Sequence, residues 1–372
     1  MKNKKILFCI TSMEKGGAER VVANLANELS DDNEVYVGTI VNKEVMYSLN
    51  KNVHYFSVAK EKKKKLNKLL KLILFPFKLV LRVCNLKKMI NKIKPDIIIS
   101  FLPEASFFTV VANKKKYKLI ISDRNDPNQE YKKFLYRFLM KKTYPKADGF
   151  VFQTLNAKEY FDNIIDFTKK DYSIIVNPVN PNFIIDRFEG KRKKEIVSVG
   201  RLQEQKNYAL LIEAFNDIKD DLKGYKLVIY GEGNQRNCLE KIIADNDLKN
   251  IVSLPGVVDD VKEKIYDSSL FVMTSNYEGI PNSLVEAMTL GLTVISTDCP
   301  CGGPRMFIED GKNGNLIEVG NKEQLKEKIL KCVRDNNYSD ECGRKAQKIV
   351  KMVEGSVVTK EWKKIISKVI GD

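Results

Sequence analysis

A polar loop between two apolar runs constrains the fold of this chain more than any other stretch. The runs at residues 270–273 and 292–296 have the length and composition of buried parallel strands, and residues 275–291 between them contain a loop followed by a helix. A strand, a crossover helix and a second parallel strand form a βαβ unit. The sequence therefore predicts an α/β protein whose ligands bind at the loops that follow the carboxyl ends of the strands.

The loop ahead of this helix has residue types that suit a bound sugar or phosphate. Gly279 lets the backbone approach a ligand closely, Pro281 suits the first helical turn, and the amides of residues 279–282 face the crevice. Glu278 and Glu286 are eight positions apart, about two helical turns, so we expect them on roughly the same side. A single glutamate is most often an exposed helix residue, but this pair, with Gly-Ile-Pro-Asn between its members, favours binding of sugar and ribose hydroxyls.

Composition limits the class of protein. The 372 residues suffice for two domains, and 43% hydrophobic residues without a low-complexity tract indicate a globular chain. Seven cysteines without zinc-type spacing indicate neither a disulfide scaffold nor a zinc site. The apolar run at residues 6–10 is too short for a signal peptide, and no run approaches the roughly 20 residues that span a membrane. We therefore expect a cytoplasmic protein, or one bound to the surface of a membrane.

The net charge of +16 comes entirely from the first half of the chain. Residues 1–175 hold 34 Lys and Arg against 18 Asp and Glu, and residues 60–94 hold 13 basic side chains against a single acid, Glu61. Basic and apolar residues are interleaved there as in two short amphipathic helices broken at Pro76, a pattern that suits an anionic bilayer surface. A solvated helix pair docked on the domain is the alternative. Nucleic acid is not expected, because no stacking platform or binding motif accompanies the charge.

The first half repeats the alternation of strands and helices. Gly16 and Gly17 follow the strand expected at residues 4–11 and open an amphipathic helix, so their loop is compatible with a phosphate, although a simple turn is the commoner role of such a pair. His54 lies in the body of a strand, away from the loop ends where such sheets bind ligands, and we expect a structural role for it. Further strands are expected at residues 34–41, 53–58, 96–102, 118–124 and 149–153.

Three polar side chains stand where strands of the first half end. Glu104 follows the strand at residues 96–102, and Asp123 and Arg124 end the strand at residues 118–124. Because the carboxyl ends of parallel strands face the ligand side of a sheet, these residues are candidates for binding an acceptor. Each of them can equally be a helix cap or a member of a local ion pair.

Two prolines, Pro178 and Pro181, mark the boundary between two α/β halves, because proline fits neither a helix interior nor a central strand. A second series of strands begins at Glu195. We predict an N-terminal Rossmann-like domain at residues 1–175, a hinge at 176–194, a C-terminal Rossmann-like domain at 195–355 and a final helix at 356–372.

Two cations in the second half are placed to bind a diphosphate. Arg201 follows the strand expected at residues 196–200, and Lys206 precedes the next helix. Arginine binds phosphate with a two-pronged guanidinium and lysine with a point charge. The nearby turn with Gly231 and Gly233 lacks the third glycine of a dinucleotide fingerprint, so we expect it to be structural.

These residues resemble the family 4 retaining glycosyltransferases of the bacterial capsule, exopolysaccharide and lipopolysaccharide type. The resemblance rests on Gly16-Gly17, Gly200-Arg201-Leu202, Gln205-Lys206-Asn207, and Glu278-Gly279-Ile280-Pro281-Asn282 with Glu286. It implies the GT-B fold, in which two Rossmann-like domains face each other across a cleft and the last helix crosses back to the first domain. The implied site has Arg201 and Lys206 on the donor diphosphate, Glu278 with Gly279, Ile280, Pro281 and Asn282 on the donor sugar, Glu286 on the ribose, Gly256 and Val257 on the base, and Gly16 and Gly17 over the phosphates.

The resemblance implies a retaining transferase that moves a hexose or N-acetylhexosamine from a UDP-sugar to a lipid-linked saccharide, at the inner face of the cell membrane. No cofactor and no metal is expected, and Asp245-Asn246-Asp247 lies at a helix end rather than in a site. Some related enzymes carry a histidine near the reacting sugar, but His54 does not match it, so no catalytic base is implied. Two alternatives stay open: a sugar-nucleotide epimerase or hydrolase of the same fold, and a non-enzymatic membrane-surface binder.

Overall fold

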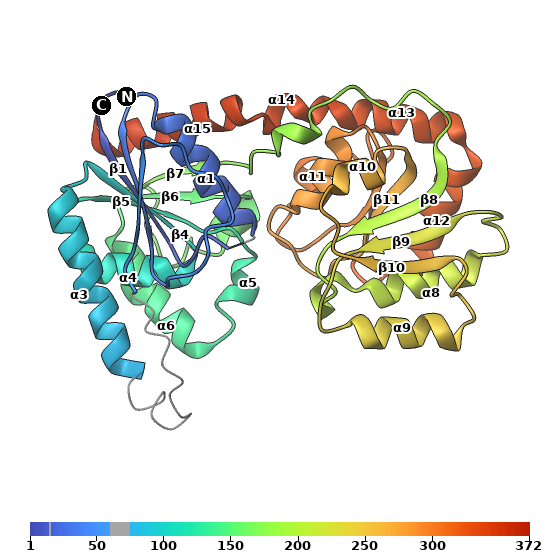
Figure 1. Cartoon of the computed structure of the whole chain (residues 1–372), viewed down its shortest axis with the longest axis horizontal. Coiled ribbons are helices and arrows are strands. Elements are labelled where there is room, and N and C mark those ends of the chain that lie inside the picture. The colour runs from blue at the N-terminus through green and yellow to red at the C-terminus, as the bar shows by residue number, and fades with distance from the viewer. Residues whose placement is uncertain (15, 60–74) are drawn as a thin grey trace. The chain divides into compact units, whose positions relative to one another are not determined.

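The computed structural model describes residues 1–14, 16–59 and 75–372, which form two compact α/β units (Figure 1). Unit 1 comprises Met1–Pro178 and Ser356–Asp372, and unit 2 comprises Val179–Gly355. The segment predicted as a hinge, residues 176–194, begins in unit 1 and continues into unit 2. The chain returns to unit 1 at Ser356, where the sequence placed the start of the final segment.

Unit 1 is built on a parallel sheet, which has seven strands within the described residues, in the order β3-β2-β1-β4-β5-β6-β7. The chain runs outward from β1 to β3 and then crosses to β4 on the other side of β1, which is the topology of a doubly wound fold. The strands are β1 (Lys5–Ile10), β2 (Glu34–Thr39), β3 (Val53–Ser57), β4 (Ile97–Phe101), β5 (Lys118–Ser122), β6 (Gly149–Phe152) and β7 (Asp171–Ile174).

Helices cover both faces of this sheet, which is why its central strands are apolar throughout. Ile6 and Phe8 of β1 share one core with α1 and α15, whereas Cys9 of the same strand lies against Thr109 of α4. Helices α3 and α6 pack against α4 and so belong to its layer. The helices are α1 (Gly17–Leu29), α3 (Phe75–Ile93), α4 (Pro103–Asn113), α5 (Pro127–Glu130), α6 (Phe134–Thr143), α7 (Leu155–Glu159) and α15 (Gly355–Ile370), with a 3₁₀ turn η1 (Tyr144–Lys146).

The last helix, α15, completes the core of unit 1. Its residue Trp362 is fully buried and stacks on Phe101 of β4, with ring centroids 5.5 Å apart. Ile365 and Ile366 join the same core. The predicted return of the C-terminal helix to the first domain is therefore confirmed.

Unit 2 has a second parallel sheet, with six strands in the order β10-β9-β8-β11-β12-β13. Its strands are β8 (Lys193–Val199), β9 (Lys226–Tyr230), β10 (Val252–Gly256), β11 (Ser268–Met273), β12 (Thr293–Thr297) and β13 (Asn315–Ile317). Its helices are α8 (Tyr208–Ile218), α9 (Arg236–Asp245), α10 (Val261–Ile265), α11 (Asn282–Thr289), α12 (Lys322–Arg334), α13 (Asn336–Ala346) and α14 (Val350–Val353). Short 3₁₀ turns are η2 (Pro181–Phe183), η3 (Glu204–Lys206), η4 (Pro304–Met306) and η5 (Gln347–Ile349).

Candidate functional site

The strand order of unit 2 brings two of the predicted loops together. The chain runs from β8 outward to β10 and then crosses to β11, which pairs with β8 on its other side. In open α/β sheets this change of direction leaves a crevice at the carboxyl ends of the two strands. Arg201 and Lys206 follow β8, and Glu278 follows β11, so all three belong to loops at this point of the sheet.

Hydrogen bonds to backbone carbonyls tie the two loops to each other. The amide of Asn276 donates to the carbonyl of Gln205 (2.8 Å), and Nε2 of Gln205 donates to the carbonyl of Tyr277 (2.8 Å). The hydroxyl of Thr274 donates to the carbonyl of Lys206 at 3.0 Å. Asn207 then turns the chain into α8 with a left-handed backbone (φ 46°), a conformation that asparagine adopts more readily than most residues. The geometry of the Lys206 loop is therefore fixed by the loop that carries Glu278.

Lys206 and Glu278 form an ion pair within this frame. Nζ of Lys206 lies 2.6 Å from Oε1 of Glu278, and the two side chains are only 15% and 11% exposed. The sequence predicted a separate ligand group for each, so their direct contact is a finding of the structure. Within this pair the carboxylate neutralises the lysine, and the lysine orients the carboxylate. Arg201 is exposed, and within the described part of the chain its guanidinium has no ion pair.

The glycine turn after β9 supports the loop of Arg201. A Cβ on Gly231, whose φ is +144°, would lie 1.9 Å from the carbonyl oxygen of Gly200, and one on Gly233 would lie 2.2 Å from that of Leu202. No side chain fits at either position. The structural role predicted for this turn is therefore confirmed, because the glycines let it approach residues 200–202 closely.

A loop after β12 supports Gly279 in the same way. A Cβ on Gly303 would lie 1.7 Å from the carbonyl oxygen of Gly279. The hydroxyl of Thr297 donates to the carbonyl of Ser275 at 2.6 Å, and the Cys299 thiol donates to the same carbonyl at 3.4 Å. Burial raises the pKa of Cys299 to about 12, so it stays a thiol and acts as a small packing residue.

Helix α11 begins one residue later than the sequence indicated. Pro281 is its N-cap, and Asn282 is its first residue. Glu278 therefore lies in the loop just before the helix, and that it faces the same side as Glu286 stays a prediction. Glu286 is half-buried in α11, whereas Gly279, Ile280 and Pro281 are buried. That Glu286 binds a ribose stays a prediction.

The predicted base-binding residues lie at the end of β10. Gly256 has a positive φ of 89°, and its carbonyl accepts a hydrogen bond from the amide of Gly231 at 2.8 Å. Val257 is exposed. This segment is therefore connected to the turn that supports residues 200–202, and its contact with a base stays a prediction.

The glycine pair of unit 1 lies where the sequence placed it, at the start of α1. Gly16 is the N-cap, in an extended conformation, and a Cβ there would lie 2.1 Å from the carboxylate of Glu19. The hydroxyl of Tyr47 accepts from the Gly16 amide at 3.1 Å and donates to its carbonyl at 2.7 Å. The amide of Gly16 is thus held by a tyrosine, which the sequence did not indicate, and the phosphate role of Gly16 and Gly17 stays a prediction.

Asp123, one of the acceptor candidates, is buried in unit 1. Its carboxylate accepts hydrogen bonds from Tyr131 (2.8 Å) and Tyr144 (2.9 Å). Burial raises the pKa of Asp123 to about 7, and the two tyrosine hydrogen bonds oppose that rise. The structure thus shows a buried carboxylate held by two tyrosines, rather than the helix cap or ion pair that the sequence left open, and the acceptor role of Asp123 stays a prediction.

Arg124 is buried as well. Its guanidinium lies over the rings of Phe101 (5.2 Å) and Trp362 (5.3 Å), and Nη1 donates to the carbonyl of Ile175 at 3.3 Å. Burial lowers the pKa of Arg124 to about 9. These contacts give Arg124 a structural role in joining α15 to the sheet. Glu104, in the first turn of α4, stays accessible, and its acceptor role remains a prediction.

The basic segment at residues 60–94 is only partly described. Residues 60–74 lie outside the described residues, and with them the first of the two predicted amphipathic helices. Pro76 is the second residue of α3 as described, so the predicted break at this proline stays a prediction. Across residues 1–14, 16–59 and 75–372, no helix combines the length and apolar character that crossing a bilayer requires.

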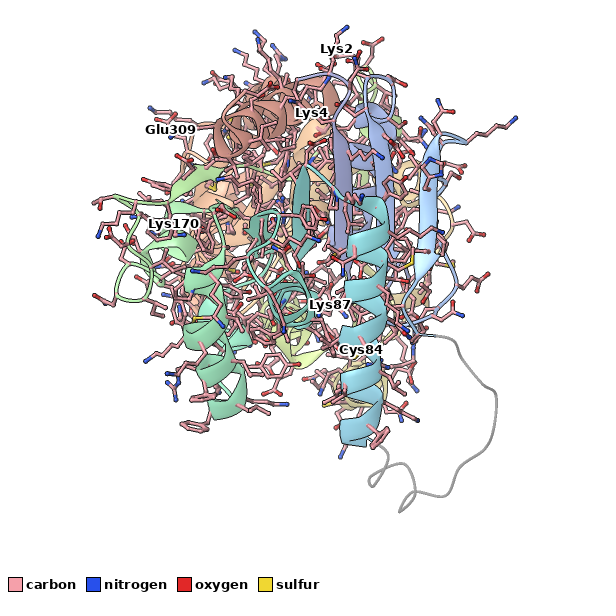
Figure 2. The ribbon with its side chains drawn as sticks, turned by 90° about the vertical axis from the view of Figure 1, so that its left-hand side faces the viewer. Lys2, Lys4, Cys84, Lys87, Lys170 and Glu309 are labelled. Atoms are coloured by element: carbon pink, nitrogen blue, oxygen red, sulfur yellow. The ribbon has the colours of Figure 1, made fainter. Side chains whose placement is uncertain are left out.

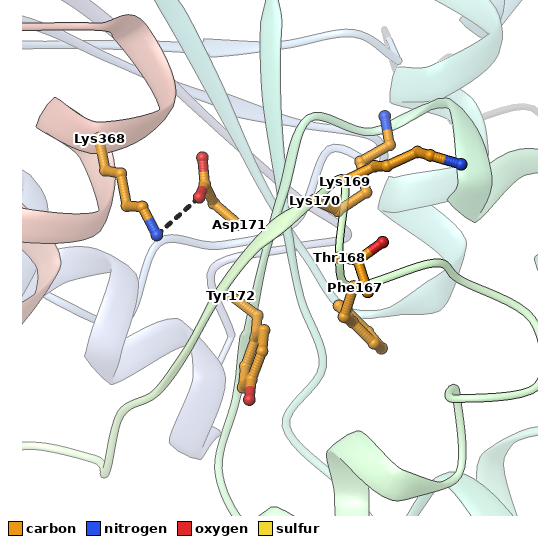
Figure 3. Close-up of a pocket in the computed structure, with 7 residues that line it drawn as sticks. All are labelled: Phe167, Thr168, Lys169, Lys170, Asp171, Tyr172 and Lys368. Atoms are coloured by element: carbon orange, nitrogen blue, oxygen red, sulfur yellow. Dashed lines mark ion pairs between the residues drawn. The ribbon is translucent and has the colours of Figure 1, made fainter.

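A pocket of about 310 Å³ lies in unit 1, around β7 (Figure 3). Its polar lining side chains are engaged with the protein: Lys368 pairs with Asp171 at 2.8 Å, and Nζ of Lys170 donates to the carbonyl of Ala147 at 2.7 Å. None of the predicted site residues lines it. Within the described residues no group of three His, Cys, Asp or Glu side chains is arranged to hold a metal ion.

Comparison with known proteins gives two family matches. Residues 15–183 match the model of Glycosyltransferase Family 4, and residues 181–349 match that of Glycosyl transferases group 1. The two matches meet close to the boundary between unit 1 and unit 2.

Similar proteins match over nearly the whole chain. The alpha-1,4-N-acetyl-D-galactosaminyltransferase of Campylobacter jejuni named for GalNAc-alpha-(1->4)-GalNAc-alpha-(1->3)-diNAcBac-PP-undecaprenol is 28% identical over 98% of this chain and 99% of its own length. A second C. jejuni enzyme is N-acetylgalactosamine-N,N'-diacetylbacillosaminyl-diphospho-undecaprenol 4-alpha-N-acetylgalactosaminyltransferase. It is 29% identical over 92% of this chain and 94% of its own length. The crystal structure of Anabaena HepE in complex with UDP has a TM-score of 0.79 at 17% identity, covering 98% of this chain and 100% of that one. The predicted GT-B fold, two parallel-sheet α/β units, is confirmed.

Proposed function

Because the chain belongs to the glycosyltransferases of family 4 and group 1, we propose that it transfers a hexose or N-acetylhexosamine from a UDP-sugar to a lipid-linked saccharide, with retention of the anomeric configuration. The acceptor class rests on the two C. jejuni relatives, whose names give undecaprenol-linked saccharides. The choice of UDP rests on HepE, which has the same fold and was crystallised with this nucleotide.

One observation carries the proposal: the buried Lys206–Glu278 pair between the loops of β8 and β11. A cation and a carboxylate side by side at the crevice of an α/β sheet match the two ends of the scissile bond in a glycosyl diphosphate. Lys206 and the exposed Arg201 bind the diphosphate, and Glu278 with the backbone of Gly279–Asn282 holds the sugar hydroxyls. When the diphosphate binds, Lys206 exchanges part of its interaction with Glu278 for a phosphate oxygen.

Charge develops on the leaving diphosphate as the glycosyl bond breaks. A preorganised donor aimed at such a charge typically contributes about 3 to 4 kcal/mol to transition-state stabilisation. The proton of the acceptor hydroxyl passes to the departing phosphate oxygen on the same face of the sugar, which gives retention without a protein nucleophile. The single histidine, His54, lies in strand β3 with its ring 4.8 Å from that of Tyr36, and it has no part in this scheme.

The acceptor side of the proposal concerns unit 1. Its basic residues, including those in residues 60–94, attract the anionic surface in which a lipid-linked acceptor is embedded. The protein then acts as a peripheral enzyme at the inner face of the cell membrane.

The test is a panel of nucleotide sugars incubated with undecaprenyl-diphosphate-linked saccharides and read by mass spectrometry. Arg201→Ala, Lys206→Ala and Glu286→Ala are each expected to lower turnover at least tenfold, because each removes one contact to the donor. Arg334→Ala, which removes an exposed arginine paired with Asp221, is the matched control and keeps wild-type turnover.

Two outcomes would overturn the assignment. Unchanged turnover in all three variants would place the donor elsewhere. Rapid conversion of a UDP-sugar without any acceptor would identify an epimerase or hydrolase instead. Retention is tested separately, by the anomeric coupling constant of the product in NMR: an inverted linkage refutes the proposed chemistry while leaving the transferase assignment in place.

A further inference from the structure

Helix α6 of unit 1 exposes a row of large apolar side chains. Phe134 is 76% exposed, Leu135 60% and Phe138 47%. Phe134 and Phe138 are one helical turn apart and stack on each other, with centroids 6.4 Å apart. Leu135 is three residues before Phe138, so the three side chains form one continuous outward face.

This face is separate from the one that α6 contributes to the protein core. Met140 and Thr143 are buried, and α6 packs against α4. A surface helix of a globular protein normally has polar residues on the side away from the core. Contiguous apolar side chains there indicate a binding surface.

The charged side chains of residues 131–147, the segment that contains α6, all have one sign. Residues 131–147 contain no Asp or Glu, and the exposed side chains beside the apolar row are cationic. Within the described chain none of these cations takes part in an ion pair. The cations are Lys132, Lys133, Arg137, Lys141 and Lys142.

The first turns of α3 also expose apolar and basic side chains. Phe77, Val80 and Leu81 are exposed, and so is Lys78. Helices α3 and α6 both pack against α4, and the beginning of α3 and helix α6 lie toward the same end of unit 1 in both views (Figures 1 and 2). Farther along α3, the exposed residues Cys84 and Lys87 can be followed in Figure 2.

We propose that α6, together with the first turns of α3, is a docking surface for an anionic lipid bilayer. Phe134, Leu135 and Phe138 insert among the acyl chains near the headgroups, and the flanking lysines and Arg137 bind the lipid phosphates. An interfacial helix of this kind needs an apolar face bordered by basic residues, and α6 has both. Charge complementarity selects anionic over neutral lipid.

A nucleic acid fits these observations less well. Its bases stack on aromatic rings, but the rings of Phe134 and Phe138 are stacked on each other, and the aliphatic Leu135 adds nothing to such a platform. The docking surface is independent of the donor chemistry: failure to bind vesicles would leave the transferase assignment intact, and failure of the assignment would leave vesicle binding intact.

Vesicle co-sedimentation of the full chain tests the apolar face. Wild type is expected to bind phosphatidylglycerol-containing vesicles and not pure phosphatidylcholine, and Phe134→Ser/Leu135→Ser/Phe138→Ser is expected to bind at least tenfold more weakly. Val319→Ser/Met352→Ser, which removes exposed apolar side chains from unit 2, is the matched control and binds like wild type.

A second pair of variants tests the cations. Each basic residue near an anionic surface contributes about fivefold to binding, so Lys141→Gln/Lys142→Gln is expected to weaken vesicle binding about 30-fold. Lys348→Gln/Lys351→Gln lowers the net charge equally, at exposed lysines of unit 2, and leaves binding unchanged.

The proposal is overturned if both α6 variants bind anionic vesicles as tightly as their controls. It is also overturned if wild type ignores the vesicles but binds single-stranded oligonucleotides through α6, or if α6 mediates self-association that sedimentation velocity detects without lipid. Turnover of a soluble short-chain acceptor by the α6 variants should stay at the wild-type value, which excludes a folding defect as the cause of lost binding.

Discussion

Breaking the Lys206–Glu278 pair should separate its structural contribution from its chemical one. Lys206→Met and Glu278→Gln each leave one charged partner half-buried without its counter-ion. Removing one member of a deeply buried pair costs about 3–5 kcal/mol, and an exposed pair is worth about 0.2–1 kcal/mol. With side chains 15% and 11% exposed, the pair lies between these limits, and we expect about 2 kcal/mol of destabilisation for each single variant.

The double variant Lys206→Met/Glu278→Gln removes both charges and leaves none uncompensated. Its unfolding free energy is therefore expected to fall by about 2 kcal/mol and not by the sum of about 4 kcal/mol, a coupling that a double-mutant cycle measures directly. Because about 1 kcal/mol shifts the melting temperature of a unit of this size by about 2–4 °C, each variant should melt about 4–8 °C lower. Turnover is expected to be as low in the double variant as in Lys206→Met, since the diphosphate has lost its lysine in both.

Urea unfolding followed by far-UV circular dichroism is the appropriate measurement. The chain's single tryptophan, Trp362, belongs to unit 1 and does not report on the unit that contains the pair. Strictly additive losses in the double variant would refute the direct coupling of Lys206 and Glu278. Turnover of Lys206→Met within threefold of wild type would refute the role of the lysine in donor chemistry.

Three further predictions concern other parts of the molecule. Gly303→Ala places a methyl group 1.7 Å from the Gly279 carbonyl, so it should lower turnover at least tenfold. Gly311→Ala has nothing within 4 Å but a left-handed φ of +75°, so it should cost local stability and leave turnover unchanged; equal turnover in the two would contradict this packing. Asp123 has a pKa of about 7 in the folded protein against about 4 in the unfolded chain, so the folded state binds the extra proton between these values. Unit 1 should therefore lose stability as pH rises from 5 to 8, by about 3 kcal/mol. Asp123→Asn should remove that dependence in urea titrations at the two pH values, and an unchanged slope would assign it to another group. Trp362→Ala should cost unit 1 about 3–5 kcal/mol in chemical unfolding, and a loss below 1 kcal/mol would show that α15 is not part of its core.

The apolar runs of the sequence were sufficient to predict the fold. Strands β8, β11 and β12 have buried centres, so they appear in the sequence as short, mainly apolar segments bounded by polar residues. The pattern does not fix helix starts to the residue, because Pro281 fits both an N-cap and a first turn, and α11 starts at Asn282.

The direction of a side chain at a strand end could not be predicted. Asp123 and Arg124 occupy the place expected for ligand-binding residues, yet both point into unit 1, where Tyr131, Tyr144 and Trp362 surround them. Tyr131 and Tyr144 lie 8 and 21 residues after Asp123 in the sequence. Trp362, the partner of Arg124, lies in the last helix of the chain. Local sequence carries no signal of such contacts.

The pairing of Lys206 with Glu278 was missed for a related reason. The two residues are 72 positions apart, and each has a plausible ligand of its own, so nothing in either motif indicates that they meet. The outward face of α6, by contrast, could have been predicted from the sequence. Residues 131–147 contain no acidic side chain, and two phenylalanines stand four residues apart between lysines, which is an unusual combination for a solvated helix.

The return of α15 to unit 1 determines the order in which this protein can fold as it is synthesised. Every strand of unit 2 leaves the ribosome before Trp362 does, so the second unit can close its core while the first still waits for its final helix. A fragment that stops at residue 178 would leave Phe101 and its neighbours uncovered and prone to aggregate. Residues 179–355 are therefore the piece to express alone, and the first unit needs its last helix supplied, either as a separate peptide or by circular permutation.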